Sequence, residues 1–353
     1  MLGRRDGANR GGNEDRPLAA GRKPLKPSHV YGPVPSRRLG LSLGVDILPF
    51  KTCSFDCIYC QLGRSDRKSG RRGRYFSSAE VLSQIKEAID INPRIDHITF
   101  SGSGEPTLNI RIGKLIREIK KMTAIPIVVL TNSSLLGCPA VRRALRAADI
   151  VVPSLDAATA ASFRRVNRPF PSIKIEDIMT GLVLFRGEFS GQIWLEIMLV
   201  KGINDSPDDI RALKKAIARI RPDKIQLNTV VRPPAEKWAR PLSRTKLKRI
   251  EEELGDRAEA VAGFRKHPNP SLAPDLKRAI LATAGRRPVT LDDITCSLGR
   301  RKDEIRPHLE TLLRWNRLCR RKHNGAVYYS AAEPARGEGK PFSGARGRSQ
   351  EDR

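Results

Sequence analysis

Three cysteines stand close together in the segment CSFDCIYC, and they are half of the six cysteines of the chain: Cys53, Cys57 and Cys60. Disulfides need paired cysteines and an oxidising compartment. The sequence shows no secretory signal and no apolar run long enough to cross a membrane. We therefore expect reduced thiols, a cytoplasmic protein and no membrane partner.

Thiolates at this spacing are candidate metal ligands. A structural zinc ion takes four ligands, usually as two cysteine pairs, but the other three cysteines stand alone and the five histidines form no spaced pair. A cubane iron–sulfur cluster also normally takes four thiolates. Three cysteines would leave one of its irons open to a ligand that reacts. A zinc site and an inert buried group of thiols stay open as alternatives.

A second segment that could do chemistry is SGSGEPT, residues 101–107. Gly102 and Gly104 imitate a dinucleotide-binding loop, but Thr107 stands where that motif needs its third glycine. Glycine lets the backbone approach a ligand closely, and Glu105 could support a cationic amino group. A plain turn between a strand and a helix would use the same residues.

Six short β-rich runs alternate with helical patterns and must position these segments. They are LSLGVDIL (41–48), IDHITFS (95–101), IPIVVLT (125–131), DIVVPSL (149–155), QIWLEIMLV (192–200) and KIQLNTVV (224–231). This alternation predicts parallel strands. Ser77 with Glu80 predicts a capping box at the start of one helix, and Ser206 with Asp209 opens another.

Polar residues follow these runs at the ends where functional groups gather. In barrels and in open parallel sheets, the site lies beyond the carboxyl ends of the strands. The cysteine segment, SGSGEPT, TNSS, SLD and Lys201 follow the first five runs in turn. We expect them to meet at one place, although periodicity alone does not choose between a barrel and an open doubly wound sheet.

The cysteine segment, with Tyr59 before its last cysteine, resembles the Cys-xxx-Cys-xx-Cys signature of radical S-adenosylmethionine (SAM) enzymes. SGSGEPT resembles their GGEP motif, with Ser103 in place of one glycine. The resemblance implies an α/β fold, a partial (β/α)6 TIM-type barrel of parallel strands. It also implies a [4Fe-4S] cluster on the three cysteines, with SAM chelating the fourth iron. An electron from an external donor would then cleave SAM to methionine and a 5′-deoxyadenosyl radical.

The resemblance further implies which side chains and loops contact SAM. The expected cofactor-binding residues are Tyr59, Gly104, Glu105, Thr131, Asn132, Ser154, Asp156 and Glu196. Asp156 is a natural acceptor for a ribose hydroxyl. Glu196 stands in an otherwise apolar strand, where an ionised carboxylate needs a partner. Ordinary turn residues and an ordinary buried pair are the alternatives.

Residues 31–63 and 229–243 resemble a narrower branch, the wyosine-base synthases, which rebuild a guanine beside the anticodon of tRNA. The likeness covers about residues 30–245. Those synthases hold a second cluster with cysteines ahead of the SAM motif, and this chain has no cysteine before Cys53. The tRNA assignment is therefore an analogy.

After Pro270 the pattern changes to three helices and a hairpin. APDLKRAILATAG, TLDDITCSLG and DEIRPHLETLLRWNRL predict the helices, with Thr290 as the N-cap of the second. Pro307 must lie in the first turn of the third helix. Asn324-Gly325 suits a tight turn between two strands. We predict a small winged-helix-like domain.

The chain is strongly basic, with 66 Lys and Arg against 38 Asp and Glu, a net charge of +28. Such an excess favours polyanions, although a generally Arg-rich proteome would produce the same balance. Residues 270–331 carry thirteen basic and six acidic side chains, and residues 64–74 carry six and one. A solvated loop and a protein-docking module are the alternatives to nucleic-acid binding. The expected nucleic-acid-binding residues are Arg301, Lys302, Arg306, Arg320, Arg321 and Lys322.

Five segments follow from these patterns: a disordered basic tail (1–27), the radical SAM barrel (28–242), a linker helix and loop (243–269), the winged-helix-like domain (270–331) and a disordered tail (332–353). The expected function is a radical SAM enzyme that modifies RNA, such as tRNA, or an RNA-bound base. The alternatives are a cluster-bearing nucleic-acid-binding redox regulator without turnover and a radical SAM enzyme that acts on a peptide or small molecule.

Overall fold

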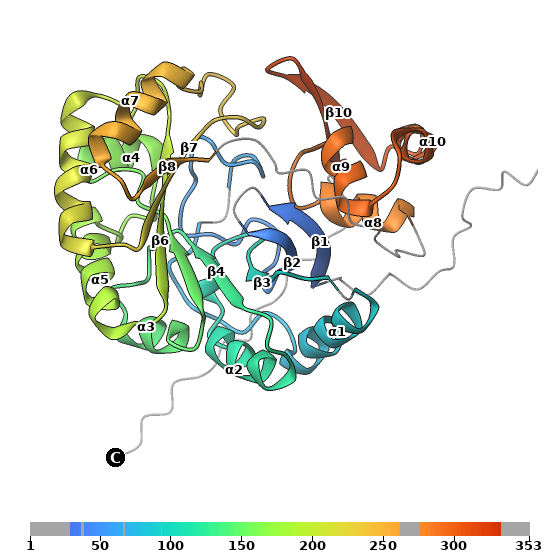
Figure 1. Cartoon of the computed structure of the whole chain (residues 1–353), viewed down its shortest axis with the longest axis horizontal. Coiled ribbons are helices and arrows are strands. Elements are labelled where there is room, and N and C mark those ends of the chain that lie inside the picture. Colours follow the sequence, from blue (N-terminus) through green and yellow to red (C-terminus); the bar gives the residue numbers. More distant parts are fainter. Residues whose placement is uncertain (1–28, 37–38, 66–67, 93, 262–275, 333–353) are drawn as a thin grey trace, which may run out of the picture.

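The computed structural model of the chain describes residues 29–36, 39–65, 68–92, 94–261 and 276–332. Within these ranges, eight strands form one sheet in the order of the chain, with helices along its outer face (Figure 1). The strands are β1 (Val30–Ser36), β2 (Gly40–Val45), β3 (His97–Phe100), β4 (Ile127–Thr131), β5 (Ile150–Pro153), β6 (Gln192–Leu199), β7 (Lys224–Thr229) and β8 (Ala258–Ala260). β1 is antiparallel to β2, and every later pair is parallel. The fold is α/β, a partial TIM-type barrel with β1 and β8 at its edges.

The six predicted strands are confirmed as β2 to β7, but the sequence pattern does not predict β1 and β8. β1 contains Gly32 and Pro33, which weaken a strand signal; proline is tolerated there because an edge strand leaves one row of backbone groups unpaired. β8 is only three residues long. Since β8 pairs with β7, the barrel sheet continues past residue 242, where the sequence pattern ends it.

Helices connect the parallel strands and cover them from outside. They are α1 (Ser78–Ile91), the short 3-10 helix η1 (Pro106–Leu108), α2 (Ile112–Met122), α3 (Pro139–Leu145), α4 (Ala160–Asn167), α5 (Ile175–Glu188), α6 (Pro207–Ile220) and α7 (Arg244–Leu254). α6 opens after Ser206, as expected, and Ser206 and Asp209 form a capping box there. The capping box expected at α1 is wrong, because the Ser77 side chain makes no capping hydrogen bond.

The strands have two differently packed faces. Side chains such as Val129, Val151 and Ile193 join the large core between sheet and helices. Alternate residues form a small apolar cluster on the opposite, inner face, which includes Val128 and Trp194. Because side chains alternate along a strand, β6 directs its even-numbered residues into the barrel.

The C-terminal part has its own core and its own sheet. Its elements are α8 (Leu276–Ala284), β9 (Val289–Thr290), α9 (Leu291–Leu298), α10 (Lys302–Arg314), β10 (Leu318–His323) and β11 (Ala326–Ala331). The three strands lie in the order β10-β11-β9. Thr290 caps α9 as expected, and Asn324 and Gly325 form the hairpin turn with positive φ. These are the predicted elements, and their identification as a winged helix stays a prediction.

Pro307 differs from its predicted place. It lies inside α10, beyond the first turn, rather than at the helix start. The helix begins earlier because Arg301 and Glu304 complete its capping contacts. The rest of α10 compensates by packing Ile305, Leu309 and Leu312 into the domain core.

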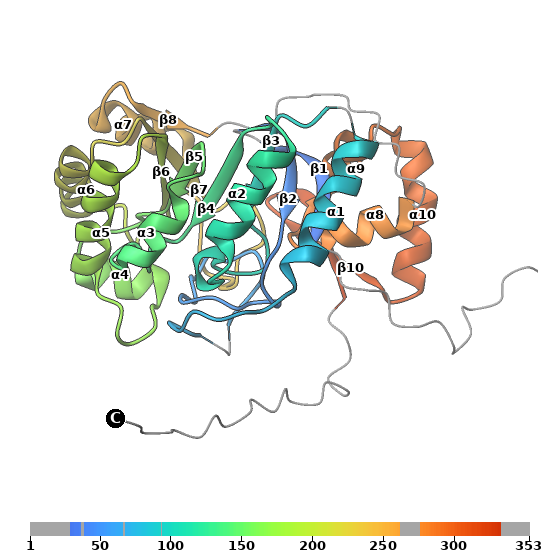
Figure 2. The same ribbon diagram turned by 90° about the horizontal axis from the view of Figure 1, so that it is seen from below.

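The C-terminal domain packs on the β1 edge of the barrel, where α8 and α9 lie beside β1 (Figure 2). The Ser297 hydroxyl on α9 donates to the Pro33 carbonyl at 3.2 Å. Arg232, from the loop after β7, lies 3.8 Å from Asp293 on α9, and both side chains are buried. The domain therefore covers the open side of the partial barrel.

Several predicted segments extend outside the described residues. The tail 1–27, the linker loop from residue 262, the first residues of the C-terminal domain (270–275) and the tail 332–353 apart from Ala332 lie there. Within the described ranges, no helix has both the length and the apolar character needed to span a bilayer.

Candidate cofactor-binding site

The three cysteines lie on the loop that follows β2, at the carboxyl end of the sheet. The loop is held by backbone hydrogen bonds, from Cys60 N to Cys57 O at 3.0 Å and from Ser69 N to Cys53 O at 2.9 Å. The cysteines border a cavity of about 130 Å³, whose other wall includes Gly102 and Gly104 from the loop after β3. The structure thus brings the two motifs of the sequence to one place.

The spread of the three cysteine side chains is compatible with a cubane cluster. In the part of the chain that the structure describes, no three His, Cys, Asp or Glu side chains converge on one ion position. In a cubane cluster each thiolate binds a different iron, so the thiolates need not converge. Burial raises the pKa of Cys53 to about 12 and raises that of Cys57 as well, so metal binding must displace protons from these thiols.

Two asparagine side chains reach the candidate ligands. Asn132 Nδ2 lies 3.5 Å from Cys53 Sγ, and Asn167 Nδ2 lies 3.4 Å from Cys57 Sγ. Amide donors next to thiolates stabilise their negative charge and tune a bound cluster. These contacts indicate that the residues fit a three-cysteine [4Fe-4S] cluster. Asn167 carries no signal in the sequence, because it lies 110 residues from its cysteine.

The loop after β3 packs tightly against the cysteine loop. A Cβ at Gly104 would lie 1.9 Å from the carbonyl oxygen of Thr52, so only glycine fits there. Ser103, which replaces a glycine of the GGEP motif, donates to Asp46 Oδ2 from its hydroxyl at 2.6 Å and its backbone N–H at 3.2 Å. Asp46 directly follows β2 and is a positioning residue that the sequence interpretation omitted.

Glu105 is buried and acts as a junction between loops. Its carboxylate accepts hydrogen bonds from the Thr107 backbone at 3.0 Å, the Thr131 hydroxyl at 2.7 Å and the Asn132 backbone at 2.6 Å. Burial raises its pKa, and the hydrogen bonds oppose that shift. The structure therefore assigns Glu105 the role of joining the ends of β3 and β4. Its direct contact with SAM stays a prediction.

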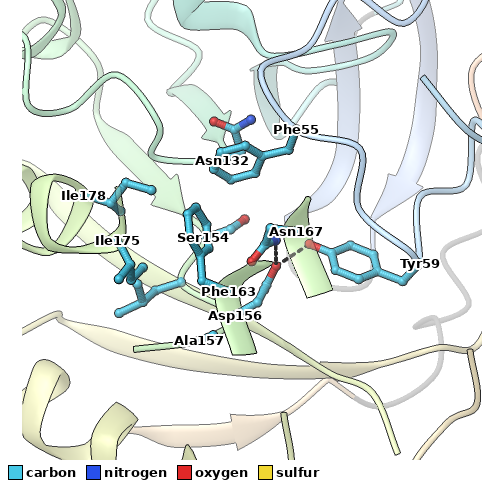
Figure 3. Close-up of a pocket in the computed structure, with 11 residues that line it drawn as sticks. Phe55, Tyr59, Asn132, Ser154, Asp156, Ala157, Phe163, Asn167, Ile175 and Ile178 are labelled. Carbon is cyan, nitrogen blue, oxygen red and sulfur yellow. Dashed lines mark hydrogen bonds between the residues drawn. The ribbon is translucent and has the colours of Figure 1, made fainter. Parts of the chain in front are cut away.

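Asp156 collects three donors at the end of β5. The Tyr59 hydroxyl and Asn167 Nδ2, the latter at 2.6 Å, donate to it (Figure 3). Met198 N also donates to it, at 2.9 Å. Burial raises the pKa of Asp156 to about 6. The same small pocket is lined by Ser154 and Asn132. Four of the expected SAM contacts therefore line one pocket beside the cysteine loop.

Glu196 lies on the inner face of β6, as its even-numbered position requires. Asn228 on β7 donates to its carboxylate at 2.6 Å. Glu196 therefore faces the barrel interior and has a buried polar partner, and its contact with SAM stays a prediction. Asn228 was absent from the expected site, since a single polar residue in a strand gives no functional signal.

The expected nucleic-acid-binding residues divide into two groups. Arg301 pairs with Asp303 at 2.5 Å and Lys302 with Asp292 at 2.6 Å, so carboxylates of the same domain offset their charges. All six side chains are exposed, including the four that these two ion pairs do not involve: Arg306, Arg320, Arg321 and Lys322. The last three lie on β10, next to the tight turn.

Among the described residues of the basic segment 64–74, some side chains hold neighbouring loops and others are exposed. Arg64 forms a two-point ion pair with Glu236 at 2.8 Å, and Arg72 Nε donates to the Thr107 carbonyl at 2.9 Å. Arg71 and Arg74 are exposed. Arg64 and Arg72 therefore fasten the cysteine loop to its neighbours.

Comparisons with known proteins agree with the motifs. A sequence model of the radical SAM superfamily matches residues 47–216. A UPF0026 protein of Helicobacter pylori (strain J99) is 32% identical over 312 residues, which are 86% of this chain and 97% of that protein. A GTPase Obg of Brachyspira hyodysenteriae is 44% identical over 219 residues, 62% of this chain but only 32% of that protein.

Two further matches are more distant. A dual-specificity RNA methyltransferase RlmN of Caulobacter sp. is 28% identical over 203 residues, 50% of this chain and 45% of that protein. The crystal structure of a radical SAM methyltransferase from Sphaerobacter thermophilus aligns with a TM-score of 0.46 at 19% identity, over 62% of this chain and 65% of the other.

Proposed function

Because this chain belongs to the radical SAM superfamily and is a UPF0026 protein, we propose that it cleaves SAM reductively and uses the resulting radical on a substrate. The superfamily uses a [4Fe-4S] cluster and SAM. The observation that carries the proposal is the single cavity bordered by the three cysteines and by Gly102 and Gly104.

The residues of this chain have separate roles in that reaction. Cys53, Cys57 and Cys60 would hold the cluster, and the backbone around Gly104 would meet the methionine part of SAM. Asp156, which accepts hydrogen bonds from Tyr59 and Asn167, would accept a further hydrogen bond from the ribose. When bound, the cluster would supply the electron for reductive cleavage of SAM, and the 5′-deoxyadenosyl group released by that cleavage would be the agent that takes hydrogen from the substrate.

Cleavage of SAM is the direct test. We expect protein that is reconstituted with iron and sulfide without oxygen, and reduced with dithionite in place of the external electron donor, to convert SAM to 5′-deoxyadenosine and methionine. Chromatography with mass detection measures both products. A protein that holds the cluster and binds nucleic acid but forms neither product would instead be a redox regulator.

RNA, or a base within RNA, is the substrate class that the charge favours. The chain carries a net charge of +28, and RNA phosphates are the natural partner of such a surface. The similarity to RlmN, which is named as an RNA methyltransferase, supports the same class. Wyosine-type chemistry on tRNA is a narrower candidate, although no cysteine precedes Cys53 to hold a second cluster.

The β10–β11 hairpin lies close to the mouth of the barrel. The Tyr328 hydroxyl on β11 donates to the Val231 carbonyl in the loop after β7 at 3.0 Å. Arg232 in that loop donates to Gln61, next to the cysteine segment, at 3.1 Å. The loop also exposes half of the Trp238 side chain. An RNA bound along the hairpin could therefore stack a base on Trp238 near the site.

Salt dependence tests RNA binding by the hairpin. If the domain neutralises four to six phosphates, log K should fall with log salt with a slope of about −3 to −4 for single-stranded RNA. Replacing Arg320, Arg321 and Lys322 by alanine should flatten the slope by up to about two units, without changing SAM cleavage. A salt titration of the full chain measures this.

The matched control removes three exposed cations from α6, on the far side of the barrel: Lys214, Lys215 and Arg219. It should leave the slope unchanged. If the unaltered chain binds RNA more weakly than millimolar at low salt, the hairpin domain does not hold RNA, and a protein-docking role replaces the proposal.

A further inference from the structure

One arginine of the C-terminal domain reaches across to the barrel. Arg286, on the turn between α8 and β9, places Nε 3.5 Å from Asp46 Oδ2, and only 14% and 8% of the two side chains are exposed. Its guanidinium also lies over the Tyr31 ring, 4.7 Å from the centroid. Arg286 Nη1 donates to the Ala282 carbonyl at 2.8 Å, which orients the side chain from within α8.

Both partners of Arg286 hold the loop that carries the SAM motif. Asp46 accepts two hydrogen bonds from Ser103. The Tyr31 hydroxyl lies 2.8 Å from the Ser101 hydroxyl. Between these two serines, Gly102 has φ of +132°, and a Cβ there would come within 2.6 Å of Asp46 Cγ. The loop is therefore shaped closely around the two residues that Arg286 contacts.

The buried charge of Asp46 is the reason that its contact with Arg286 affects the loop at residues 101–104. A buried carboxylate is costly unless a cation or hydrogen-bond donors compensate it. Asp46 accepts hydrogen bonds from Ser103, in the loop that carries the SAM motif. Its nearby cation, Arg286, comes from the C-terminal domain. If Arg286 is removed, the carboxylate is drawn toward water or other donors, and the Ser103 contacts that depend on its position weaken.

We propose that Arg286 is a positioning residue through which the docked C-terminal domain orders residues 101–104 for SAM binding. The proposal rests on SAM binding at this loop but not on the identity of the substrate. It makes the C-terminal domain part of the cofactor site, in addition to any role in holding RNA.

The test is SAM affinity of the full chain with its cluster reconstituted, measured by equilibrium binding without RNA. We expect Arg286→Ala to weaken SAM binding roughly three- to thirtyfold, the range seen when a residue that couples two regions is changed. Arg314→Ala, which removes an exposed charge from α10 of the same domain, should leave the affinity unchanged. Iron content should be equal in all three proteins.

A double-mutant cycle identifies the route. If Arg286 acts through Asp46, then Arg286→Ala combined with Asp46→Asn should weaken SAM binding less than the product of the two single effects. Effects that multiply independently would show that Arg286 acts elsewhere, which would overturn the proposal.

Hydrogen exchange provides a measurement that does not depend on cofactors. In protein without cluster or SAM, Arg286→Ala should speed amide exchange in residues 101–105 and leave strand β6 unchanged. Unchanged exchange in residues 101–105 together with unaltered SAM affinity would refute the proposal. A protein that fails to bind RNA or to cleave SAM would not refute the proposal, because neither activity enters the SAM-binding or hydrogen-exchange measurement.

Discussion

Alanine in place of Cys53 should remove the iron–sulfur cluster. The unaltered protein, purified without oxygen, should contain about four irons per chain and show the EPR signal of a reduced cubane cluster, which shifts when SAM is added. The variant keeps two of the three thiolates on a loop that holds no further cysteine, so we expect less than about one iron per chain and no cubane signal. Iron analysis and EPR spectroscopy measure the two quantities.

The matched control is Cys319→Ala. Cys319 is exposed on β10 and lies in the C-terminal domain, so its loss should leave the iron content unchanged. A stoichiometric zinc ion without iron in the unaltered protein would contradict the cluster assignment. So would a Cys53→Ala variant that keeps the full complement of iron.

Gly104→Ala should strongly weaken SAM binding. The added Cβ would meet the Thr52 carbonyl at 1.9 Å, and both groups belong to backbone that cannot rotate away. The loop after β3 or the cysteine loop must therefore move. We expect this movement to weaken SAM binding at least about tenfold and to lower the free energy of unfolding by about 1–3 kcal/mol. Equilibrium binding and denaturant unfolding measure these changes.

Gly187→Ala is the control for this substitution. Gly187 lies exposed in α5, and a Cβ there meets nothing within 4 Å. Alanine favours a helix over glycine, so the free energy of unfolding should rise by about 0.5–1 kcal/mol with SAM binding unaltered. Normal SAM affinity in Gly104→Ala would show that the close contact of the two loops does not shape the cofactor site.

The sequence by itself determined those features that depend on residues close together in the chain. The cysteine spacing lies within one loop, and Ser206 caps α6 through Asp209 only three residues away. The apolar runs of β2 to β7 are legible because a strand buried on both faces needs continuous apolar residues. Residue types close together in the chain are not always sufficient. Ser77 and Glu80 are the types that form a capping box, but the Ser77 side chain makes no capping hydrogen bond.

Only the tertiary structure decided which distant groups share the site. Asn167 reaches Cys57 from 110 residues away, Glu105 binds donors from the end of β4, and Arg286 arrives from another domain. A polar residue in a loop looks the same in the sequence whether it ends in solvent or beside a buried sulfur or carboxylate. The packing of the sheet and the C-terminal domain determines which partner such a residue contacts. Because an unpaired buried charge is costly, the folded arrangement is one in which the buried charges are paired.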